Sequence, residues 1–202
     1  MKVINLGEQN SVLNQFVSEI RDVNIQKDSL RFRRNLERIG EIFAYEISKT
    51  LNYVPSEVET PLGIANIQLC NQTIVLGTIL RAGLPLHQGL LNYFDCAQNS
   101  FIAAYRKYGK DNKFTIQIEY ASSPKLEGKI LILADTMLAT GASIVLAYEK
   151  LCQEGEPIHT HLVCPITSAY SIDYLSKHLP HKRVTLWVSA IDEELTNKSY
   201  IV

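Results

Sequence analysis

The chain has 202 residues, a formal net charge of −1, and 46% hydrophobic against 20% charged residues. These values exclude a disordered chain and a global positive field for nucleic acid or an anionic membrane, so any polyanion site has to be local. No apolar run reaches the length of a membrane span and the N-terminus lacks a signal-peptide pattern. We therefore expect a cytoplasmic protein with one globular domain over residues 1–202.

The N-terminal part of the chain carries helical patterns. Asp28 and Ser29 provide a helix start, and apolar residues then recur at helical spacing up to Leu51, which predicts a long amphipathic helix. A shorter helix is expected around 12–20. The segment Thr60-Pro-Leu-Gly63 breaks the helical pattern.

The rest of the chain alternates apolar runs with helical segments, which predicts an α/β fold with a mainly parallel central sheet flanked by helices. The nearly continuous apolar runs are typical of strands buried on both faces. In such sheets ligands bind beyond the carboxyl ends of the strands. The predicted strands are 73–80, 100–105, 129–134, 159–165 and 184–189, and the predicted helices are 83–94, 141–153 and 169–178.

Residues 105–123 predict a β-hairpin arm. Gly109-Lys-Asp-Asn112 lies between two runs, and Phe114, Ile116 and Ile118 alternate with polar residues. A lid over the site and a dimer contact are both open interpretations of this arm.

Metal and redox motifs are not predicted. The four cysteines form no Cys-x-x-Cys pair, and we expect them to be buried reduced thiols: Cys70, Cys96, Cys152 and Cys164. His159 and His161 share one face of a predicted strand, but no third ligand is apparent. Trp187 is expected in the core or an interface.

Basic residues are frequent between 21 and 38. One interpretation is a patch for a nucleotide or another effector, and the other is a solvated face paired with acidic neighbours such as Glu37 and Glu41. We favour the ion-paired face. The basic residues are Arg21, Lys27, Arg31, Arg33, Arg34 and Arg38.

The most informative stretch joins a buried strand to a helix between 130 and 143. Asp135 follows the apolar run, and its carboxylate accepts hydrogen bonds only, which suits a pair of sugar hydroxyls. The small residues from Ala139 to Ser143 allow backbone N–H groups to approach an anion at the positive end of the helix. A phosphate-binding turn is one interpretation, and an ordinary junction capped by Thr140 or Ser143 is the other.

Two arginines lie near other strand ends. Arg81 follows the strand that ends at Leu80, and its planar guanidinium suits phosphate, although exposure to solvent is the commoner position for an arginine. Arg106 follows Tyr105 at the start of the hairpin arm, where the residues alone predict only a surface position beside Lys107.

Several segments, in order along nearly the whole chain, resemble the uracil phosphoribosyltransferases of the type I phosphoribosyltransferase superfamily. The segment Asp135-Thr-Met-Leu-Ala-Thr-Gly-Ala-Ser143 is similar to their phosphoribosyl-diphosphate loop, which usually has Asp-Pro-Met-Leu-Ala-Thr-Gly-Gly-Ser. The other matching segments are Glu59-Thr-Pro-Leu62, Ile79-Leu-Arg-Ala-Gly-Leu84, Tyr105-Arg106, Ala190-Ile-Asp192 and Tyr200-Ile-Val202.

The resemblance implies a step of pyrimidine salvage, in which the 5-phosphoribosyl group of 5-phospho-α-D-ribose 1-diphosphate is transferred to uracil to give UMP and diphosphate. It implies that Asp135 holds the ribose hydroxyls, and that Arg81 and Arg106 bind the diphosphate with substrate-bound Mg²⁺. It also implies that Ile201 belongs to the uracil pocket. The residues implied to form the loop around phosphoribosyl diphosphate are Thr136, Met137, Leu138, Ala139, Thr140, Gly141, Ala142 and Ser143.

The expectations about regulation and oligomeric assembly come from the resemblance alone. Relatives of this kind are homodimers or larger homo-oligomers, and some are activated by GTP, although no residue of this chain marks a GTP site. The resemblance implies small-molecule substrates and no nucleic-acid or membrane partner.

The chain departs from the family pattern at three places. Thr136 replaces the usual proline and frees a backbone N–H. Ala142 replaces the second glycine, which costs about 1–2 kcal/mol if that position needs a positive φ and nothing otherwise. Family members also continue past Tyr-Ile-Val with a segment that contacts uracil, so an alternative is a regulatory homologue that binds phosphoribosyl diphosphate or a nucleotide without turnover.

Overall fold

The computed structural model describes residues 1–108 and 114–193, with side chains described outside 106–115. Among these residues, eight strands form one sheet in the order β1-β10-β9-β7-β4-β5-β6, with β8 beside β9. Neighbouring strands run parallel apart from the antiparallel pair β5 and β6, which confirms the predicted sheet. The strands are β1 (Lys2–Asn5), β4 (Ile74–Leu80), β5 (Gln98–Tyr108), β6 (Phe114–Ser122), β7 (Ile130–Ala134), β8 (Met137–Leu138), β9 (His159–Ser168) and β10 (Val184–Asp192).

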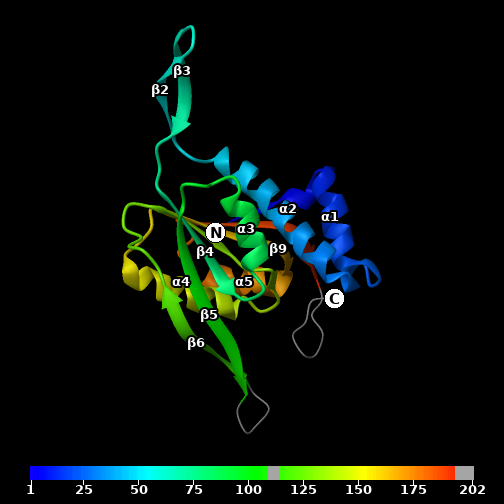
Figure 1. Ribbon diagram of the computed structural model, residues 1–202. Helices are drawn as coiled ribbons and strands as arrows, with labels where there is room; N and C mark the ends of the chain where they lie inside the picture. The colour runs from blue at the N-terminus through cyan, green and yellow to red at the C-terminus, as the bar shows by residue number, and fades with distance from the viewer. Residues whose placement is uncertain (109–113, 194–202) are drawn as a thin grey trace.

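Helices cover both faces of the sheet (Figure 1). Helices α1 (Val12–Arg21), α2 (Ser29–Ser48) and α3 (Leu84–Leu91) pack on one face, and α4 (Ala142–Leu151) and α5 (Ala169–His178) pack on the other. Short 3₁₀ helices follow β1, α1 and α4: η1 (Leu6–Glu8), η2 (Ile25–Lys27) and η3 (Cys152–Glu154). Within the described ranges, no helix has both the length and the hydropathy that a membrane crossing requires.

Strand β7 is the most enclosed part of the sheet. Ile130, Ile132 and Ala134 pack towards α1, α2 and α3, whereas Leu131 and Leu133 pack towards α4 and α5. Side chains alternate between the two faces along a strand, so a strand covered on both sides has to be apolar at every position. The apolar run that predicted this strand reflects that double burial.

Strands β1, β2, β3 and the short β8 were not predicted. The break at Thr60–Gly63 is the turn of a hairpin formed by β2 (Tyr53–Thr60) and β3 (Gly63–Cys70), which projects away from the sheet (Figure 1). Both of its strands are largely exposed, so they lack the apolar alternation that predicts a half-buried strand. Strand β1 is too short for a periodicity and forms at an edge of the sheet by pairing with β10.

The expectation of buried cysteines is wrong for Cys70 and Cys96, which are both exposed as free thiols. Cys70 ends β3 in the projecting hairpin, and Cys96 lies in the surface turn between α3 and β5, so no layer covers either of them. Cys152 is partly buried, and Cys164 in β9 is fully buried.

The ion-paired interpretation of the basic segment is confirmed for three of its arginines, of which Arg21 pairs with Asp192 in β10. Arg31 reaches from α2 to the buried carboxylate of Glu19 in α1, with nitrogen–oxygen distances of 2.7 and 2.8 Å. Arg34 pairs with Glu37 on the same helix at 2.6 Å. The hydrogen bond from Arg31, helped by amides that include Asn35, lowers the pKa of Glu19 to about 2.

Helices α2 and α3 approach each other through glycines. A Cβ on Gly89 of α3 would lie 1.9 Å from the carbonyl oxygen of Glu37, and one on Gly40 of α2 would lie 2.4 Å from that of Leu86. These oxygens are backbone atoms that cannot move without moving the helices. The crossing therefore sets the position of α3, which begins just after Arg81 and Gly83.

We expect Gly89→Ala to lower the free energy of unfolding by about 1–3 kcal/mol, because overpacking at a backbone contact outweighs the better helix propensity of alanine. Urea unfolding followed by circular dichroism measures the change. The matched control is Gln88→Ala at the exposed neighbouring position of α3. A Gly89→Ala variant as stable as this control would show that the two helices need no close approach.

Candidate functional site

The predicted site residues gather at the carboxyl edge of the sheet, where β4, β7 and β5 end. Thr78 of β4 lies opposite Ala134 of β7, so Asp135 and Arg81 both leave the sheet at this edge. Arg106 lies in β5 where that strand pairs with β6, but its side chain is outside the described residues. Ile201 lies outside them altogether.

Asp135 directly follows β7, and its backbone N–H donates to the carbonyl of Val163 in β9 at 3.0 Å. The residue keeps some solvent exposure, but protein atoms closely surround its carboxyl group. Burial raises the pKa of Asp135 from 3.8 to about 7, although the backbone N–H of Thr136, which donates to Oδ1 at 2.8 Å, acts in the opposite direction. No cation among the described residues pairs with this carboxylate, so it is a poorly compensated charge facing the site.

The loop after Asp135 is held by distant strands. Met137 and Leu138 form the short strand β8, which pairs with the end of β9. The hydroxyl of Ser168 donates to the carbonyl oxygen of Ala139 at 2.6 Å. Gly141 then takes a left-handed conformation, with φ of +78°, immediately before α4.

Helix α4 begins without a side-chain cap. Its N-cap residue is Gly141, and the hydroxyl of Thr140 reaches only the N–H of Ala142, at 3.4 Å. Among the described residues, the N–H groups of Ser143 and Ile144 have no acceptor within hydrogen-bonding range. Uncapped N–H groups at the positive end of a helix bind anions. The capped-junction interpretation therefore loses its main support.

Ala142 is the first residue of α4 and has a helical backbone. The positive φ falls on Gly141, which the chain shares with the family pattern. The substitution of the second glycine by alanine therefore brings no backbone strain.

The loop that carries Arg81 is compact, and this arginine has no partner among the described residues. The Leu80–Arg81 peptide bond is cis, and a Cβ on Gly83 would lie 2.2 Å from Oγ1 of Thr78. Arg81 is exposed, and no described residue forms a hydrogen bond or ion pair with its guanidinium. A free guanidinium at the same edge as an uncapped helix adds positive potential there.

One residue that holds the loop was not predicted. Ser168 ends β9, and its hydroxyl also accepts from the N–H of Ser171 as the N-cap of α5. Its capping role is visible in the sequence, but its contact with Ala139 depends on the pairing of β7, β8 and β9.

Metal ligands do not cluster in the described part of the chain. In residues 1–108 and 114–193, no three His, Cys, Asp or Glu side chains gather to hold a metal ion. The rings of His159 and His161 lie 4.7 Å apart, at the opposite edge of the sheet.

Comparisons with solved structures first define the class of protein. A hypoxanthine phosphoribosyltransferase from Staphylococcus aureus has a TM-score of 0.53 at 14% identity, covering 81% of this chain and 76% of that chain. A purine phosphoribosyltransferase from Pyrococcus horikoshii has a TM-score of 0.51 at 13% identity, covering 80% and 90%. A protein from Aquifex aeolicus is closer, with a TM-score of 0.86 at 27% identity, covering 98% and 91%. The chain has the phosphoribosyltransferase fold.

Sequence comparisons then define the family. The family described as uracil phosphoribosyltransferase matches residues 7–202. A uracil phosphoribosyltransferase from Porphyromonas gingivalis is 50% identical over 202 residues, which are 100% of this chain and 93% of the relative. One from Pyrococcus furiosus is 32% identical over 200 residues, covering 96% and 83%. This chain belongs to the uracil phosphoribosyltransferase family, and the resemblance identified from its motifs is confirmed.

We expect Gly141→Ala to lower the free energy of unfolding by about 1–2 kcal/mol, because an L-residue is strained at a positive φ. The added Cβ would also lie 3.3 Å from Cγ of Leu175. The paired control is Ala142→Gly, which we expect to cost less than about 1 kcal/mol at a helix start. Equal losses for the two variants in urea unfolding would contradict the assignment of the turn to Gly141.

Asp135→Asn should change how stability depends on pH. Burial raises the pKa of Asp135 to about 7 in the folded protein, so the folded chain keeps a proton that the unfolded chain loses above pH 3.8. The free energy of unfolding therefore falls as the pH rises through this window. We expect the variant to be about 2–4 kcal/mol more stable than the wild type at pH 8, and no more stable near pH 4.

Urea unfolding at both pH values measures this difference. Asp173→Asn is the matched control, because that exposed carboxylate is paired with Lys177 on α5. A pH-independent effect of Asp135→Asn would contradict an unusual proton affinity at Asp135.

Proposed function

We propose that this protein transfers the 5-phosphoribosyl group of 5-phospho-α-D-ribose 1-diphosphate to uracil, giving UMP and diphosphate. Membership of the uracil phosphoribosyltransferase family supports the reaction. The observation that carries the proposal is the uncapped start of α4, which follows Asp135 at the carboxyl edge of the sheet. A sugar phosphate offers both an anion for the helix and hydroxyls for the carboxylate.

We assign the 5′-phosphate to the loop from Ala139 to Ser143. The free N–H groups of Ser143 and Ile144 support this role, and the hydroxyls of Thr140 and Ser143 add donors. Ser168 acts through Ala139, because its hydrogen bond occupies that carbonyl oxygen and holds the loop to the end of β9. Thr136, Met137, Leu138 and Ala142 complete the proposed contact segment.

We assign the ribose hydroxyls to Asp135. Its carboxyl group is protonated in a large part of the molecules at neutral pH when the site is empty, because burial raises its pKa to about 7. Two hydroxyl donors would favour the ionised form, and positive charge that develops on the sugar as the C1–oxygen bond breaks would favour it further. Asp135 therefore interacts more strongly with the transition state than with the bound substrate, which is the condition for lowering the barrier of the chemical step.

We assign the diphosphate to Arg81 and Arg106, whose guanidinium groups would stabilise the charge that builds on the leaving group. Arg81 has no competing partner among the described residues, which supports its half of this assignment. Mg²⁺ would neutralise phosphate charge when bound. Since the described residues form no acidic cluster, substrate oxygens would supply most of its ligands, with the Asp135 carboxylate as the oxygen donor that fits it at this edge.

The remaining assignments follow from the family. We propose that Ile201 contacts uracil and that the protein acts in the cytoplasm as a homodimer or larger oligomer. Exposed apolar side chains on the β2–β3 hairpin, including Ile64, Ile67 and Leu69, support an oligomer because monomers seldom expose such a run. A GTP site remains an expectation, and the ion pairs of Arg31 and Arg34 give it no support.

The direct test combines titration with phosphoribosyl diphosphate and Mg²⁺ and a uracil turnover assay that measures UMP. We expect saturable binding and formation of UMP. Binding without UMP would favour the regulatory alternative, and the absence of binding would overturn the proposed site.

We expect Arg81→Ala to weaken substrate binding and turnover together by about 2–4 kcal/mol in transition-state stabilisation, because a charged contact to the diphosphate is lost. Steady-state kinetics with varied phosphoribosyl diphosphate measures kcat/KM. Arg183→Ala is the matched control, since that exposed arginine pairs with Glu156 beyond the amino end of β10. Near-normal kinetics of Arg81→Ala would refute the role of Arg81.

A further inference from the structure

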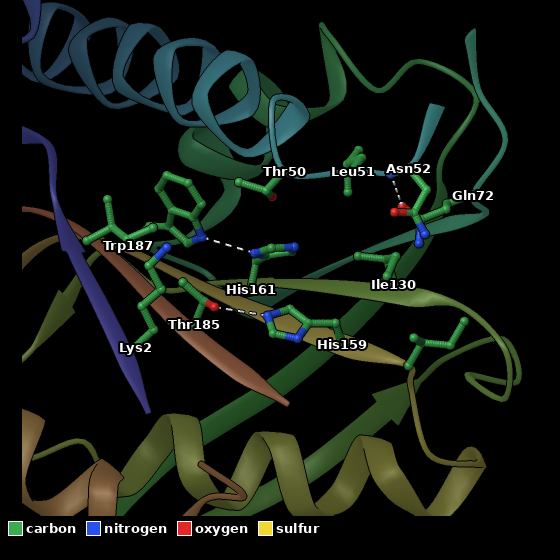
Figure 2. Close-up of a pocket in the computed structure, with 12 residues that line it drawn as sticks. Lys2, Thr50, Leu51, Asn52, Gln72, Ile130, His159, His161, Thr185 and Trp187 are labelled. Carbon is green, nitrogen blue, oxygen red and sulfur yellow. Dashed lines mark hydrogen bonds between the residues drawn. The ribbon is translucent and has the colours of Figure 1, made fainter. Parts of the chain in front are cut away.

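A cavity of about 320 Å³ lies at the edge of the sheet opposite to the phosphate loop. The amino ends of β1, β7, β9 and β10 meet the end of α2 there (Figure 2). Its lining includes Lys2, Ile130, His159, His161 and Trp187, which are all outside the proposed phosphoribosyl-transfer site. A cavity of this size can hold a small organic molecule.

His161 presents a hydrogen-bond donor to this cavity. The residue is 4% exposed, and the indole N–H of Trp187 donates to its Nδ1 at 3.0 Å. An indole nitrogen can only donate, so Nδ1 carries no proton and the hydrogen of the neutral ring is on Nε2. Figure 2 shows Nε2 directed away from Trp187 into the cavity, and no described residue accepts its hydrogen bond. This nitrogen is not among the buried polar atoms that lack a partner, so it is accessible from the cavity and can donate to solvent or to a ligand there.

Gln72 and Lys2 add further donors to the lining, which also contains the hydroxyls of Thr50 and Thr185 and the side-chain amide of Asn52. The Oε1 atom of Gln72 accepts from the N–H of Asn52 at 2.7 Å, which leaves the amide NH₂ of Gln72 free to donate. Lys2 extends from β1 along Trp187 (Figure 2), and no Asp or Glu lies among the lining residues. Burial lowers the pKa of His159, and burial together with His159 lowers that of His161 to about 3. Both rings are therefore neutral, and Lys2 supplies the full positive charge.

Flat and apolar groups form the walls between these donors. The ring of His161 is 6.0 Å from that of Trp187 and 4.7 Å from that of His159, measured between centroids. Ile130 and Leu51 add aliphatic surface. Aromatic faces and aliphatic side chains suit a planar ring, whereas the donors and the ammonium group suit a negative charge.

We propose that this cavity binds a small planar anion, a single ring that carries one carboxylate. The carboxylate accepts the Nε2–H of His161, and the ring packs against Ile130 and Leu51, while Lys2 contributes positive charge from the Trp187 side of the cavity.

Trp187 is the only tryptophan of the chain, so its fluorescence reports on this cavity. The probes are benzoate, the neutral benzamide of the same shape, and acetate, which has the charge without the ring. We expect benzoate to change the fluorescence saturably, with a dissociation constant on the order of 1 mM for a ligand of this size. Benzamide and acetate should each bind at least about tenfold more weakly, because each lacks one of the two interactions.

Two variants locate the binding. Lys2→Met changes an exposed side chain and should weaken benzoate binding at least about tenfold without unfolding the protein. Arg81→Ala alters the opposite edge of the sheet and should leave benzoate binding unchanged. The ¹⁵N-resolved Nε2–H signal of His161 provides a second readout, and benzoate should shift it in the wild type.

Three results would each overturn the proposal. One is no saturable response of either the fluorescence or the His161 signal, and another is equal affinity for benzoate and benzamide. The third is loss of benzoate binding in Arg81→Ala but not in Lys2→Met, which would place the anion in the transfer site.

Discussion

The burial of β7 on both faces is the constraint on which the rest of the structure depends. Its five side chains are at most 3% exposed, and they belong alternately to the two cores of the molecule. A strand enclosed in this way has one register and one depth, because a shift by one residue would exchange the two faces. The carboxyl end of β7 therefore places Asp135 at the edge of the sheet with little freedom. The amino end, at Ile130, is fixed equally well beside His159.

This rigidity lets the candidate site keep groups that a protein normally neutralises. Asp135 lacks a cationic partner among the described residues, and the start of α4 lacks a cap. Each of these features costs stability, and both face the same edge. Such costs persist where the surrounding packing is strong enough to hold them and where a ligand relieves them. The hydrogen bond from Ser168 to Ala139 adds to this rigidity, because it ties the loop to a neighbouring strand.

The sequence predicts those helices and strands whose pattern lies within a short stretch of consecutive residues. The strand at 73–80 and the helix at 169–178 follow from an apolar run and from helical spacing, and both are confirmed to within a few residues. The β2–β3 hairpin is missed because its strands are covered on neither face. Whether α4 is capped also depends on distant contacts, so the residues alone left two interpretations of 139–143 open. The family motifs predicted roles for Arg81 and Asp135, whereas nothing local indicated that His161 would face a cavity.

The pairing of β1 with β10 has a consequence for synthesis on the ribosome. Lys2 to Asn5 leave the ribosome long before their partners, Thr185 to Val188. Strand β1 therefore waits without β10 while all the residues between them are made, since contacts between distant segments form late. The wall of the cavity that Lys2 provides is completed only when β10 pairs with β1, so chains that stop before β10 cannot assemble it.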